Sequence, residues 1–91
     1  MVVARKFYIS GMVQGVGYRF FTQRAAARHQ VSGYVRNLPD GRVEAFAQGE
    51  TEIVEAFKHD LTAGSTFSKV EHIEEIVIEP NEFYKSFRIE R

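Results

Sequence analysis

Short runs in which apolar and polar side chains alternate mark the expected strands of this 91-residue chain. Successive side chains of a strand point to opposite faces, so a period of two predicts a sheet with one buried face. The runs cover residues 5–12, 32–37, 42–48 and 69–79, and a short final strand is expected at 86–89.

A hairpin is the clearest local prediction. Residues 38–41 read Leu-Pro-Asp-Gly and separate the second run from the third. Proline presets φ at a turn and Asp-Gly tolerates its corner, so the two runs should pair as antiparallel neighbours. In the fourth run the alternation slips at Glu74 and Glu75. A β-bulge is therefore expected there.

Apolar residues recur at helical spacing in two other stretches. Residues 20–29 are rich in alanine, a strong helix former, and Gln30 should end this helix in a left-handed cap. A second helix opens at 49–52, where acidic residues suit its dipole, and ends at 63–65. The residues expected on the buried sides of the two helices are Phe21, Ala25, Ala26, His29, Ile53, Val54, Phe57 and Leu61.

The order of elements is strand, helix, strand, strand, helix, strand. Two strand-helix-strand units joined by a hairpin give the ferredoxin-like fold. We therefore expect an α+β sandwich with a four- to five-stranded antiparallel sheet and both helices on one face. The length suits a single domain over residues 1–91. Such a fold hosts many functions and decides none of them.

Composition narrows the function. Twelve basic and twelve acidic residues cancel, which argues against a nucleic-acid binder or an electrostatic membrane binder. The chain has no cysteine, so thiol chemistry and disulfides are excluded. His29, His59 and His72 lack metal-ligand spacing, and no metal site is expected. With no secretory signal or membrane-length apolar run, a cytoplasmic monomer is the expectation.

A glycine-rich stretch at residues 11–19 joins the first strand to the first helix. The first N–H groups of a helix lack partners and carry the positive end of its dipole, and Gly15 and Gly17 allow close approach to a ligand. Arg19 adds a planar fork that fits two phosphate oxygens. These features favour a bound phosphate. On spacing alone, a plain turn with a solvated arginine is an equal alternative, and the stretch fits neither a nucleotide P-loop nor a dinucleotide fingerprint.

Two motifs together resemble the signatures of the acylphosphatases. The first is residues 11–19, Gly-Met-Val-Gln-Gly-Val-Gly-Tyr-Arg, and the second is residues 33–44, Gly-Tyr-Val-Arg-Asn-Leu-Pro-Asp-Gly-Arg-Val-Glu. Their order and spacing, and the terminal Phe-Arg-Ile at 87–89, extend the resemblance over nearly the whole chain. It implies hydrolysis of the carboxyl-phosphate bond of small acyl phosphates, with no metal, no cofactor and no covalent intermediate.

The resemblance also assigns residues. By position, Arg19 would bind the phosphoryl group and Asn37 would position the attacking water. N–H donors would come from Gln14, Gly15, Val16, Gly17 and Tyr18. Inorganic phosphate or sulfate is the expected competing anion. Because an acyl phosphate already has a good leaving group, one arginine, a set of N–H groups and one amide suffice chemically.

Two other functions compete with this enzyme. Ferredoxin-like sheets can bind RNA through exposed aromatic residues, and Tyr34 and Phe46 are the candidates here. The neutral net charge argues against that function. A domain that senses phosphate without cleaving a bond is the other possibility, and the presence of both Arg19 and Asn37 argues against it.

Overall fold

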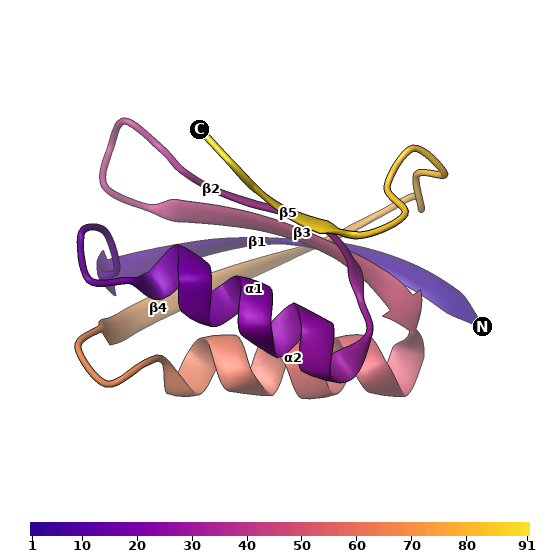
Figure 1. The fold of residues 1–91 in the computed structure, drawn as a ribbon, viewed down its shortest axis with the longest axis horizontal. Helices are drawn as coiled ribbons and strands as arrows, with labels where there is room; N and C mark the ends of the chain where they lie inside the picture. The colour runs from indigo at the N-terminus through magenta and orange to yellow at the C-terminus, as the bar shows by residue number, and fades with distance from the viewer.

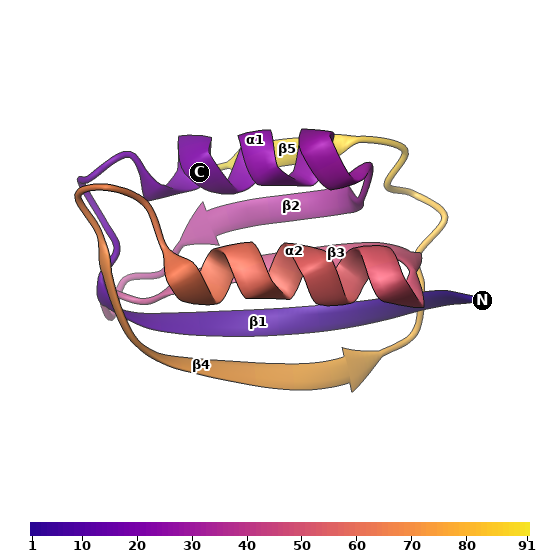
Figure 2. The same cartoon turned by 90° about the horizontal axis from the view of Figure 1, so that it is seen from below.

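A sheet forms one layer of the molecule and two helices form the other (Figures 1 and 2). The computed structural model describes residues 1–91. Both helices run along the same face of the sheet, as the sequence predicts (Figure 2). Neither helix is long and apolar enough to cross a bilayer. The elements in chain order are β1 (Val2–Met12), α1 (Tyr18–His29), β2 (Ser32–Asn37), β3 (Val43–Glu50), α2 (Thr51–Ala63), β4 (Lys69–Ile78) and β5 (Phe87–Glu90).

The five strands lie in the order β4-β1-β3-β2-β5. All neighbours are antiparallel except β2 and β5, which are parallel. The expectation of a fully antiparallel sheet is thus wrong at this edge. After β4, the chain crosses to the opposite edge and enters beside the start of β2, where the Gly33 N–H donates to the Ser86 carbonyl at 2.9 Å. The last strand therefore runs in the direction of β2.

The ends of α1 show how local conformation sets an element's length. The helix begins at Tyr18, two residues before the expected start, because the left-handed Gly17 acts as its N-cap. At the other end Gln30 has φ 60° and ψ 39°, which confirms the expected left-handed cap. The Val31 N–H then donates to the Ala26 carbonyl at 3.0 Å and closes the last turn.

The irregularity in β4 does not lie at Glu74 and Glu75. Both residues pair in unbroken register with β1, and the register shifts instead opposite Ser10 and Gly11, where Glu71 is left unpaired. Glu75 is an acidic residue on the helix-facing side of β4, bound by Lys58 of α2 at 2.5 Å. In the sequence, a charged residue at a position that faces the helices looks like a break in the alternation of apolar and polar residues. The predicted position of the bulge is therefore wrong.

The core fills the space between the helices and one face of the sheet. Small residues of α1 allow the helix to approach the sheet closely, and larger side chains of α2 fill the remaining space. These buried residues form one continuous cluster, which excludes water from the backbone that carries the site. Its larger members are Phe7, Ile9, Val13, Tyr18, Val35, Val43, Val54, Phe57 and Leu61.

On the other face of the sheet, residues 79–86 cover part of β2 and β3. Tyr84 packs on both Tyr34 and Phe46, with ring centroids 5.5 and 5.4 Å away. Gln48 holds the same segment by donating to the Asn81 carbonyl and accepting from the Asn81 N–H. Phe46 is only 4% exposed, so it is not free to stack on a base. The structure therefore gives no support to the RNA-binding alternative.

Candidate active site

The turn between β1 and α1 leaves its N–H groups free. Gly15 and Gly17 have φ of 73° and 79°, a conformation that residues with a Cβ adopt at a cost. The Gly17 carbonyl accepts from the Phe21 N–H at 3.0 Å, which is the first hydrogen bond of the helix. No N–H group of residues 14–20 donates a hydrogen bond within the protein. These donors lie at the positive end of the α1 dipole and favour a bound anion.

Gln14 fixes this turn to the β2–β3 turn. Its Nε2 donates to the carbonyls of Leu38 and Arg42, each at 2.8 Å. Val16 packs against the core from the same turn. The glycine-rich turn is therefore held beside the end of β2, where Asn37 lies. The two segments are more than twenty residues apart, and the sequence carries no signal for this side-chain contact.

Tyr18 anchors the start of α1 from inside. Its side chain is fully buried, and its hydroxyl donates to the Leu61 carbonyl near the end of α2 at 2.8 Å. Burial raises the pKa of the Tyr18 hydroxyl above its ordinary value, so the group remains a neutral donor. The Tyr18 carbonyl in turn accepts from the Thr22 hydroxyl at 2.9 Å. The first turn of α1 is thus held in place against α2.

Arg19 carries a charge that no acidic side chain neutralises. Its only hydrogen bond goes to the Glu90 carbonyl at 3.4 Å, and none of the ion pairs of the protein includes it. Arg36 and Arg42, by contrast, contact Glu44 and Asp40. A guanidinium without an acidic partner keeps its two-pronged donor edge available for an anion.

Asn37 ends β2 with a polar group that lacks a partner. Its Oδ1 is buried and accepts no hydrogen bond within the protein. Buried acceptors in folded proteins are nearly always satisfied, by water or a ligand where the protein supplies no donor. The orphaned oxygen therefore marks a position at which a water or ligand donor belongs.

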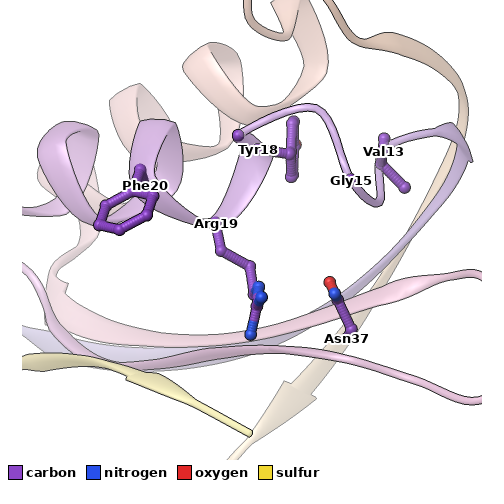
Figure 3. A pocket seen from close by; sticks show the side chains of 7 residues that line it. Val13, Gly15, Tyr18, Arg19, Phe20 and Asn37 are labelled. Atoms are coloured by element: carbon purple, nitrogen blue, oxygen red, sulfur yellow. The ribbon is translucent and has the colours of Figure 1, made fainter.

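These groups meet around one pocket of about 150 Å³ (Figure 3). The structure brings Gly15, Gly17, Tyr18, Arg19 and Asn37 together at it, as the sequence analysis expects. The side chains of Gln14 and Val16 do not line it and anchor the loop instead, whereas their N–H groups remain unbonded. Val13 and Phe20 also line the pocket and were missed. The sequence signal for Phe20 is its position directly after Arg19, whereas its exposure is visible only in the structure.

The fold and the pocket define a small α+β domain with a cationic pocket at one end. Comparison with known proteins identifies the family. The acylphosphatase family model matches residues 5–89. The chain is 45% identical to an acylphosphatase of Petrotoga mobilis over 98% of this chain and 99% of the relative. It is 50% identical to an acylphosphatase of Thermus thermophilus over 72% and 75% of the two chains.

A solved structure supports the same relationship. The crystal structure of acylphosphatase from Bacillus subtilis superposes with a TM-score of 0.93 at 35% identity, and all of both chains is covered. The chain belongs to the acylphosphatase family, a family of enzymes.

Proposed function

We propose that the protein hydrolyses small acyl phosphates at the pocket of Arg19 and Asn37, releasing a carboxylate and inorganic phosphate. One observation supports this most strongly. An arginine without an acidic partner and an amide oxygen without a donor line the same small pocket, beside unbonded N–H groups. Anion binding and the positioning of a water require these two kinds of group.

The phosphoryl group is held by Arg19 and the loop. The guanidinium binds two phosphoryl oxygens, and N–H groups of residues 14–18 bind the third. Charge is spread over these equatorial oxygens in the transition state, so fixed donors around them lower the barrier. The anchoring of Gln14 and Tyr18 keeps the donors in place without reorganisation during the reaction.

Asn37 positions the nucleophile. Its Oδ1 accepts a hydrogen bond from one O–H of a water, which aims a lone pair of that water at phosphorus. The water oxygen forms a bond to phosphorus while the bond from phosphorus to the carboxyl oxygen breaks. The electron pair leaves with the carboxylate, and the water's extra proton passes to the phosphate or to solvent. An amide is a weak base, so Asn37 acts by orientation.

The lining residues match a substrate that needs no acid catalyst. They include an arginine, an amide and a deeply buried tyrosine, and neither a carboxylate nor an imidazole. A carboxylate departs without protonation, whereas an alkoxide requires an acid. The pocket therefore suits acyl phosphates over simple phosphomonoesters, and the charge of Arg19 takes the part that a metal ion plays elsewhere.

Phosphate release from benzoyl phosphate tests this function. The rate should be the same with and without a chelator such as EDTA. An alkyl phosphomonoester should be hydrolysed far more slowly, because the site supplies no acid for its leaving group. Activity that disappears in chelator and returns with a divalent ion would contradict the proposal, as would equal rates on the two substrates.

Gly15→Ala tests the loop. A Cβ at Gly15 meets no protein atom within 4 Å, so its main folding cost is the left-handed backbone, about 1–2 kcal/mol. If Gly15 allows close approach of phosphate, inhibition by inorganic phosphate should weaken about tenfold, the value of one charged hydrogen bond. Circular dichroism should remain unchanged.

Gly41→Ala is the matched control. Gly41 also has a positive φ, 96°, and open space around its Cβ position, but it does not line the pocket. The Gly41→Ala variant should have a similar folding cost from its positive φ, and its inhibition constant for phosphate should be unchanged. Equal inhibition constants for phosphate in the two variants would show that Gly15 does not contribute to phosphate binding.

A further inference from the structure

Phe20 is an exposed aromatic residue at the edge of the pocket. Its side chain is 67% exposed, whereas the next residue, Phe21, packs on Tyr18 with ring centroids 5.6 Å apart. Single exposed apolar residues are common and mean little alone. Phe20 differs because it follows Arg19 directly and lines the same pocket as Asn37.

A second hollow lies beside the pocket and shares Arg19 and Phe20 with it. It has a volume of about 270 Å³ and lies between the start of α1 and the end of β5. Its lining residues are Arg19, Phe20, Ile89 and Arg91, of which two are apolar, two are cationic and none is acidic. Arg19 and Phe20 line both hollows, so a phosphoryl group bound in the pocket lies next to this second hollow, which we call the groove.

The geometry of the reaction predicts on which side of the phosphoryl group the acyl group lies. In an in-line displacement, the leaving group departs on the side of phosphorus opposite the attacking water. Asn37 holds the water in the proposed function, so the acyl group extends away from Asn37. Figure 3 shows Asn37 and Phe20 on opposite sides of Arg19. Asn37 lines the pocket but not the groove, which lies toward the β5 edge of the sheet.

We propose that the groove binds the acyl group of the substrate, with Phe20 and Ile89 as its apolar walls and Phe20 as the residue that selects aromatic acyl groups. This inference rests on the proposed function, because it needs the phosphoryl group at Arg19 and the water at Asn37. A benzoyl ring presents a flat apolar surface that an aromatic side chain binds by stacking or by an edge contact. An acetyl group is too small to cover either wall.

The test compares two substrates across three proteins. The specificity constant kcat/KM is measured for benzoyl phosphate and for acetyl phosphate with the unchanged protein, Phe20→Ala and Phe83→Ala. Phe83 is a matched control, since it is 68% exposed and lies on residues 79–86, at the opposite end of the molecule from the glycine-rich turn (Figure 1). The phosphate inhibition constant is measured for each protein.

In Phe20→Ala the ratio of kcat/KM for benzoyl phosphate to kcat/KM for acetyl phosphate should fall about tenfold. This is the effect expected from losing one aromatic contact and the apolar area that it buries. The fall should come from a higher KM for benzoyl phosphate, because the contact is present in both ground state and transition state. The phosphate inhibition constant should stay the same, and Phe20→Tyr should keep the ratio. Phe83→Ala should match the unchanged protein throughout.

Different results would contradict the role of Phe20 and the proposed function. A ratio that is unchanged in Phe20→Ala, or equal losses on both substrates, would overturn the role of Phe20 and leave the proposed function standing. An unchanged protein that hydrolyses neither substrate would overturn the proposed function and this inference with it.

Discussion

Arg19→Lys is expected to lower kcat/KM for benzoyl phosphate by roughly a thousandfold, the upper range for loss of a fixed donor to transition-state charge. The lysine keeps the positive charge, but a single ammonium cannot span two phosphoryl oxygens in a fixed geometry. Because those oxygens are charged in both substrate and transition state, binding and chemistry should both suffer. Steady-state kinetics should show a lower kcat, a higher KM and weaker inhibition by phosphate.

Arg24→Lys is the control for this variant. Arg24 lies on the same helix, is exposed, belongs to no ion pair and does not line the pocket. The same exchange there should leave every kinetic constant within experimental error. If Arg19→Lys behaved like Arg24→Lys, the phosphoryl group could not be bound by the Arg19 fork.

Asn37→Ala is expected to lower kcat by roughly a hundredfold to a thousandfold, or about 3–4 kcal/mol, while phosphate still inhibits at nearly the same concentration. The reason is that a positioned water matters only as the reaction proceeds, whereas phosphate binding depends on Arg19 and the loop. The measurement is kcat for benzoyl phosphate together with the phosphate inhibition constant. A large loss of phosphate affinity would make Asn37 a ligand of the phosphoryl group and refute its role toward water.

Asn37→Asp separates shape from charge. Aspartate has the size of asparagine, but its negative charge lies beside an anionic substrate. This variant should therefore weaken phosphate inhibition where Asn37→Ala does not. Equal inhibition constants in the two variants would place the side chain away from the bound anion.

Much of the fold follows from local signals in the sequence. The bounds of β2 are those predicted, because the strand lies between the left-handed Gln30 and the Leu-Pro-Asp-Gly turn. The direction of β5 was not predictable, since it depends on how residues 79–86 cross the sheet. The misplaced bulge in β4 had a similar origin. Glu75 looked like a break in the pattern because its partner, Lys58, is known only from the tertiary structure.

The candidate site also has parts that the sequence predicts and parts that only the structure reveals. The glycines and Arg19 are recognisable because a strand, a glycine-rich turn and a helix start follow one another along the chain. Asn37 is indistinguishable from an ordinary turn residue until its motif is recognised, and its orphaned oxygen is visible only in the structure. The hydrogen bonds from Gln14 join segments far apart in sequence. The groove behind Phe20 needs the parallel β5 to supply Ile89, so no local pattern could reveal it.

Hydrolysis of benzoyl phosphate in ¹⁸O-labelled water tests the central claim most directly. If Asn37 aims a water at a phosphorus held by Arg19 and the loop, the bond between phosphorus and the carboxyl oxygen breaks. Mass spectrometry should then find one labelled oxygen in the phosphate released during enzymatic turnover and none in the benzoate. Label in the benzoate, with unlabelled phosphate, would show attack at the carbonyl carbon and contradict the account.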